Sequence, residues 1–86
     1  MPRQFVVIDA PTPSDQKIAG VVEKAFGDSG KVPLKDLENR LVKGVGYQAF
    51  SVHSEDNPDL KEYHRRGYSI YEVRGGIVYK YPRFDQ

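Results

Sequence analysis

Apolar residues first gather in a continuous run near the N-terminus. The segment "RQFVVIDA" is rich in β-branched residues and predicts a β-strand over residues 4–9. An amphipathic helix follows, and its apolar stripe consists of Ile18, Val21, Val22 and Phe26. Thr12 and Asp15 have the spacing of a capping box, with Pro13 at the first helical position. Gly27 is suited to end this helix.

A second amphipathic stripe begins after a short extended link around Gly30 and Val32. The stripe consists of Leu34, Leu37 and Leu41. Acidic residues come early in this segment and basic residues late, which complements the helix dipole, and Gly44 is predicted to close the helix. Within the first helix, Gly20 costs about 1 kcal/mol relative to alanine, and we interpret it as a place of close backbone approach.

Residues 45–57 have the least regular pattern of the chain. Three apolar residues there, which anchor either a loop or a short strand, are Tyr47, Phe50 and Val52. A third, short helix is predicted in "PDLKEYHRR", with Asn57 as its N-cap and Pro58 at its first position. Gly67 is expected to end it.

Two apolar runs flank a pair of glycines in "YEVRGGIVYKY", which predicts a β-hairpin. We expect a three-residue loop, Arg74-Gly75-Gly76, in which Gly76 takes the left-handed conformation. This register collects on one face Tyr71, Val73, Ile77, Tyr79 and Tyr81. A loop of the two glycines alone would scatter the apolar residues over both faces.

Taken in order, these elements predict one α+β domain over residues 1–86, a winged helix of three helices and a C-terminal hairpin wing, preceded by an extra strand. The stretches "GKVPLKDLENRL", "AF", "DLKEY" and "YEVRGGIVYKY" resemble the OST-HTH/LOTUS family over residues 18–81. The chain departs from that family at residues 55–57, where Glu-Asp-Asn replaces a Tyr-Gly-Phe-like step. The resemblance implies RNA binding or the docking of protein partners such as helicases.

Composition adds little until the charges are placed along the chain. The formal net charge is +1, but residues 61–83 carry six basic and two acidic residues. Such a basic end suits contact with a polyanion. The chain has no cysteine, and it shows neither a membrane-spanning apolar run nor a signal-like N-terminus, so we expect a cytoplasmic protein that does not bind membranes.

The basic end suggests non-catalytic binding of nucleic acid, RNA or DNA, through the third helix and the wing. The candidate contacts are Lys61, Arg65, Arg66, Tyr68, Arg74 and Lys80. Cationic side chains reach phosphates, and a tyrosine ring offers a stacking surface to a base. The alternative is a protein-interaction module or small inhibitor that uses the hairpin or the N-terminal strand. The pattern leaves the oligomeric state and the target open.

Catalysis is not expected from these residues. The two histidines, His53 and His64, lie in no motif with metal-ligand spacing. Gly75 and Gly76 precede a strand rather than a helix, so they form a turn and not a phosphate-binding loop. We therefore expect no catalytic residue, no metal and no cofactor.

Overall fold

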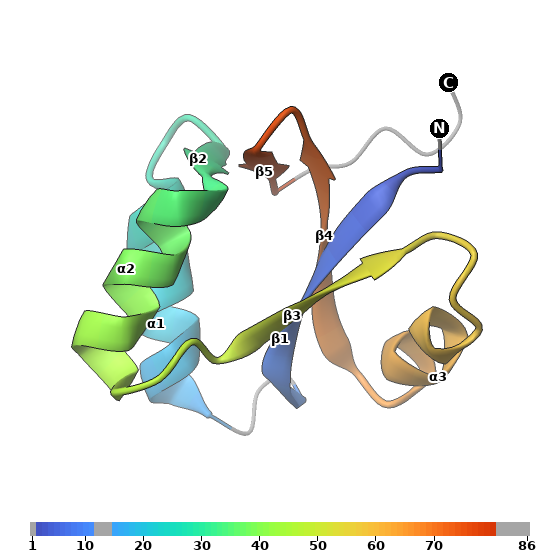
Figure 1. Cartoon of the computed structure of the whole chain (residues 1–86). Helices are drawn as coiled ribbons and strands as arrows, with labels where there is room; N and C mark the ends of the chain where they lie inside the picture. Colours follow the sequence, from blue (N-terminus) through green and yellow to red (C-terminus); the bar gives the residue numbers. More distant parts are fainter. Residues whose placement is uncertain (1, 12–14, 81–86) are drawn as a thin grey trace.

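A computed structural model describes residues 2–11 and 15–80 of the chain. In this part it contains eight elements, in the order β1 (Gln4–Pro11), α1 (Gln16–Phe26), β2 (Lys31–Pro33), α2 (Leu34–Val45), β3 (Phe50–Ser54), α3 (Asp59–Arg65), β4 (Tyr68–Arg74) and β5 (Ile77–Tyr79). The strands form one antiparallel sheet in the order β2-β5-β4-β1-β3. The predicted α+β class, with three helices and a C-terminal hairpin, is confirmed (Figure 1).

Strand β1 lies inside the sheet, between β4 and β3. Its residues Phe5, Val6, Val7 and Ile8 are all buried. Because successive side chains of a strand point to opposite faces, burial of four in a row shows that both faces of the sheet are covered at β1. The predicted strand is confirmed, and it continues to Pro11.

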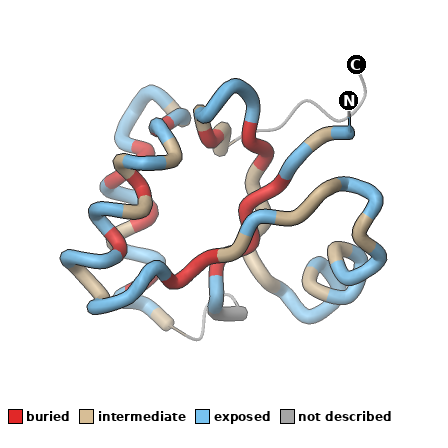
Figure 2. The backbone as a smooth tube through the Cα atoms, in the orientation of Figure 1, coloured by how far each residue is buried: buried red, intermediate tan, exposed pale blue. Residues whose placement is uncertain are grey.

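Helices α1 and α2 cover one face of the sheet and form the main core together with the strands. The buried residues of this cluster are Val6, Ile8, Ile18, Val22, Ala25, Phe26, Val32, Leu37, Leu41, Ala49, Phe50, Val73 and Val78. Figure 2 shows them on the inner side of both helices and along the middle of the sheet. The two helical stripes predicted from apolar spacing therefore face the sheet, as expected.

The start of α1 differs from the prediction. The side chain of Asp15 accepts hydrogen bonds from the backbone N–H groups of Lys17 and Ile18, so Asp15 is itself the N-cap and the helix begins at Gln16. The predicted cap, Thr12 with Pro13, lies outside the described residues. The predicted end at Gly27 is confirmed.

The end of α2 was predicted two residues too early. Gly44 lies inside the helix, which ends at Gly46 in the left-handed conformation, with φ 98°. Gly44 has a packing role instead, because a Cβ built on it would lie 2.7 Å from Cγ2 of Val21 on α1. The close approach predicted at Gly20 is wrong, since a Cβ there would have no neighbour within 4 Å.

These two glycines therefore make a matched pair of substitutions with opposite expected effects. Gly44→Ala should lower the free energy of unfolding by about 1–2 kcal/mol, because overpacking against Val21 outweighs the gain in helix propensity. Gly20→Ala should raise it by up to about 1 kcal/mol, since only the propensity changes. Urea denaturation followed by circular dichroism measures both. A stabilising Gly44→Ala would contradict the close packing of α1 on α2.

Helix α3 lies apart from the other two helices. It packs against β4 on the opposite face of the sheet, and Figure 1 shows it at the far side of the sheet from α1 and α2. Between α2 and α3 the chain forms β3, which pairs with β1. The three-helix core expected of a winged helix is therefore not what these helices form, because β3 carries the chain across the sheet before α3 begins.

The hairpin also corrects the predicted register. Arg74 pairs with Ile77 and Val73 with Val78, so the loop consists of Gly75 and Gly76 alone. Both glycines have positive φ, 56° and 77°, as a type I′ turn requires. The predicted three-residue loop was chosen to keep apolar residues on one face. That reasoning failed because apolar residues are needed on both faces of this sheet.

Candidate nucleic-acid interface

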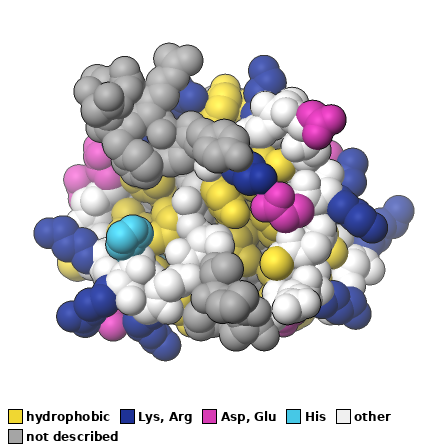
Figure 3. Space-filling view, turned by 180° about the vertical axis from the view of Figure 1, so that it is seen from behind, with side chains coloured by type: hydrophobic (Ala, Val, Ile, Leu, Met, Phe, Trp, Pro, Cys, Tyr) yellow, Lys and Arg dark blue, Asp and Glu magenta, His cyan; other side chains and the backbone are white. Residues whose placement is uncertain are grey.

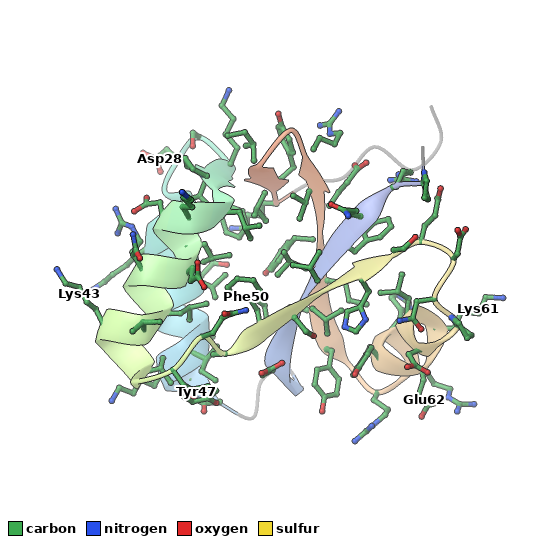
Figure 4. The ribbon with its side chains drawn as sticks, viewed as in Figure 1. Asp28, Lys43, Tyr47, Phe50, Lys61 and Glu62 are labelled. Carbon is green, nitrogen blue, oxygen red and sulfur yellow. The ribbon has the colours of Figure 1, made fainter. Side chains whose placement is uncertain are left out.

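Most of the predicted contact residues lie on α3 and at the start of β4. Lys61, Arg65 and Arg66 are exposed, and Arg65 forms an ion pair with Glu62 one turn earlier. Figure 4 shows Lys61 and Glu62 pointing away from the sheet into solvent. The helix thus presents cations on its outer side, with one of them engaged by a carboxylate of the same helix.

Tyr68 connects this basic helix to the sheet. Its ring packs edge-on against Tyr63 of α3, with 5.1 Å between the centroids. The guanidinium of Arg66 lies over the Tyr68 ring, 5.5 Å from its centroid. This is the geometry of a cation–π contact, and it orders an arginine next to a half-buried aromatic ring. Arg66 therefore covers one face of the Tyr68 ring.

His53 supports the segment that leads into α3. Its Nε2 lies 2.8 Å from the hydroxyl of Ser51, and its Nδ1 lies 3.1 Å from the side-chain nitrogen of Asn57. The Asn57 oxygen accepts a hydrogen bond from the N–H of Asp59, so the amide nitrogen must be the group that faces His53. Nδ1 then accepts, and Nε2–H donates to Ser51.

This arrangement is opposite to that of a serine nucleophile and its base. A general base needs an unprotonated nitrogen facing the hydroxyl, whereas the Nε2 of His53 carries the proton in this network. The ring of His53 also packs at 5.4 Å from that of Tyr63, which fixes it against α3. We therefore assign His53 a positioning role for the start of α3.

The remaining two predicted residues lie elsewhere. Arg74 is at the opposite end of β4 from Tyr68, which places it roughly 20 Å away along the strand. Lys80 forms an ion pair with Glu23 of α1, with 2.8 Å between Nζ and Oε1. Seen from behind, the Lys and Arg side chains lie around the rim rather than in one patch (Figure 3). The six predicted residues therefore do not share one surface.

The side chain of Arg74 is instead part of a charge cluster around Glu72. Glu72 is buried, and its carboxylate lies 3.0 Å from Nε of Arg3 and 3.8 Å from Nε of Arg74. Each arginine also lies over an aromatic ring, Arg3 over Phe5 at 5.1 Å and Arg74 over Tyr79 at 4.0 Å. The hydrogen bond to Glu72 raises the pKa of the Arg3 guanidinium above its usual value.

This cluster was not predicted from the sequence. The available signal was the spacing of Glu72 and Arg74, which are two residues apart on a strand and therefore share a face. The pairing with Arg3 joins residues 69 positions apart and depends on how β1 and β4 associate. Arg74 thus takes part in contacts within the sheet, whereas the prediction gave it only a contact with nucleic acid.

No family model matches the chain, and no curated protein or solved structure matches it significantly. Among residues 2–11 and 15–80, no helix is long and apolar enough to cross a membrane. In the same part of the chain, no group of three or more His, Cys, Asp and Glu side chains is placed to hold a metal ion. The site geometry is therefore the basis for any functional assignment.

Proposed function

We propose that this domain binds nucleic acid without catalysis, through α3 and the start of β4. The supporting observation is the placement of the Arg66 guanidinium over the Tyr68 ring, next to the exposed cations Lys61 and Arg65. Phosphates attract the cations, while an unstacked base can pack on a ring of this kind. The resemblance to the LOTUS family suggests nucleic-acid binding, but α3 lies on the other side of the sheet from α1 and α2 (Figure 1), so the proposal rests on the α3 surface itself.

The proposed surface is smaller than the predicted one. Arg74 and Lys80 are held by Glu72 and Glu23 and lie away from α3, so they are not part of it. Three cations give a salt dependence with a slope of about −3 for a duplex and about −2 for a single strand. Binding through so few phosphates is weak, and its salt dependence is shallow compared with that of a protein that makes many phosphate contacts.

A fluorescence-anisotropy titration at two salt concentrations tests the proposal. The ligands are duplex DNA, duplex RNA and both single strands, which also separates DNA from RNA. Arg66→Ala should weaken binding to all sequences alike and reduce the salt slope by about 1. Tyr68→Leu should weaken binding to single strands more than to duplexes, because only unpaired bases can stack.

The matched control is Lys35→Ala, which removes one exposed cation from α2 on the other side of the sheet. It should leave the affinity and the slope nearly unchanged. Absence of binding at low salt, or an equal effect of Lys35→Ala and Arg66→Ala, would count against the α3 surface.

The alternative function, protein interaction through the hairpin or the N-terminal strand, stays a prediction, and the sheet order excludes only the pairing of a partner's strand with these elements. The N-terminal strand β1 is flanked by β4 and β3, and the hairpin strands are flanked by β1 and β2. Neither presents a free edge to a partner. The two edge strands of the sheet are β2 and β3.

A further inference from the structure

The two edge strands of the sheet differ in the residues that discourage pairing with a strand of another chain. Strand β2, at one edge, contains Lys31 and Pro33, both exposed. Lysine and proline on an edge strand discourage pairing with another chain, because one adds a charge and the other lacks an N–H. Strand β3, at the other edge, reads "FSVHS" and has no lysine, proline or acidic residue. Only β3 lacks these two protections.

The backbone of β3 has its free groups at every second residue. The N–H of Asp9 donates to the oxygen of Ala49, and the N–H of Glu55 donates to the oxygen of Arg3. These bonds fix the alternation. The backbone N–H and C=O groups of Ser51 and His53 point toward β1, and those of the alternate residues point away from it. Outward groups therefore belong to Phe50, Val52 and Ser54.

Of these three residues, Val52 has the fewest hydrogen-bond partners for its outward backbone groups. The oxygen of Phe50 accepts from the side chain of Gln48, and the oxygen of Ser54 accepts from the N–H of Asn57. Within the described part of the chain, no residue pairs with the outward N–H and C=O of Val52. Its side chain is 42% exposed. In Figure 1, no described element passes in front of β3.

We propose that β3 pairs with β3 of a second copy, antiparallel and across a two-fold axis at Val52. Val52 is the midpoint of Phe50–Ser54, and outward groups recur symmetrically on either side of it. The two Val52 residues would exchange a pair of hydrogen bonds, and Phe50 would pair with Ser54 of the partner subunit. This self-complementary spacing is what an isologous contact requires.

Charge at the two ends of β3 favours the antiparallel direction. The last turn of α2, the helix that precedes β3, carries Lys43. The turn after β3 carries Glu55 and Asp56, both exposed. Antiparallel pairing brings the start of each strand, where Lys43 and the exposed Asp9 carry opposite charges, beside the acidic turn that follows the other strand. Parallel pairing would bring like ends together.

Sedimentation velocity from low to high micromolar protein tests the dimer. The wild type should sediment as a dimer at the upper end of this range. Val52→Lys should be monomeric throughout, because it sets two like charges opposite each other on the axis. Val52→Pro should also be monomeric, since it removes the outward N–H while leaving the bonds between β1 and β3 intact.

Val42→Lys is the control, because Val42 is similarly exposed, at 47%, but lies on α2. It should remain dimeric, and circular dichroism of each variant confirms that the fold persists. In the wild type, amide exchange adds a readout that needs no variant: the Val52 N–H should be protected at high but not at low concentration. A monomeric wild type, or a dimer that survives both Val52 substitutions, would overturn the proposal.

Discussion

Phe26→Ala should lower the free energy of unfolding by about 3–5 kcal/mol, the largest effect expected of any single substitution considered for this domain. Phe26 is the last residue of α1 and is 1% exposed. Its ring meets the ring of Tyr71 on β4 edge-to-face, with 4.9 Å between centroids. Removing the ring opens a cavity between α1 and the sheet. Because small domains have only about 5–15 kcal/mol of stability, the variant is expected to unfold at much lower urea concentration.

A conservative series separates the cavity from the aromatic contact. Phe26→Leu retains most of the buried volume and should cost about 1.5 kcal/mol or less. A double-mutant cycle of Phe26→Leu with Tyr71→Leu should give a coupling of about 0.5–1.5 kcal/mol, the usual range for an aromatic pair. If Phe26→Ala lost less than Phe26→Leu, the placement of this ring between α1 and β4 would be wrong.

The elements predicted most accurately are those that depend on residues close together in the sequence. The stripes of α1 and α2 repeat every three to four residues, and each repeat reports directly on one helical face. Gly27 follows α1 directly, and Gly67 follows the C-cap Arg66 of α3, and both have a positive φ, which is a local requirement that favours glycine. By contrast, the sequence does not show which of Gly44 and Gly46 ends α2. The helix continues through Gly44, which packs against Val21, and Gly46 is its C-cap.

The arrangement of the strands depends on contacts that the sequence pattern does not contain. Residues 50–53 alternate between apolar and polar, as a strand does, but this pattern does not show that they pair with β1. The pairing of β1 with β4 likewise joins the two ends of the chain. The winged-helix prediction followed from the order of elements, and the order alone does not distinguish a helix on one face of the sheet from a helix on the other.

The same distinction between local and long-range contacts separates the six predicted contact residues into two groups. Lys61, Arg65, Arg66 and Tyr68 were predicted together and do lie together, because a helix and the strand that follows it keep neighbours in sequence close in space. The other two, at positions 74 and 80, were grouped with them by charge alone. Their carboxylate partners come from the same strand or from 57 positions away, and both residues lie away from α3.

Replacing both turn glycines, in Gly75→Ala/Gly76→Ala, should lower the free energy of unfolding by about 2–4 kcal/mol. A left-handed conformation costs an L-residue roughly 1–2 kcal/mol, and both positions have positive φ. A Cβ at either position would meet no atom within 4 Å, so the cost arises from the backbone conformation and not from a clash. Urea denaturation of the double and both single variants measures it.

The single variants decide the register of the hairpin. In the observed two-residue loop, Gly75→Ala and Gly76→Ala should cost similar amounts, because both residues are left-handed. In a three-residue loop, only the last residue would be left-handed, and Gly75→Ala would be nearly neutral. Gly75→Asn is the matched control, since Asn-Gly is the preferred pair of a type I′ turn, and it should retain close to wild-type stability. A tolerant Gly75→Ala beside a sensitive Gly76→Ala would restore the three-residue loop, and with it the opposite facing of Ile77 and Tyr79.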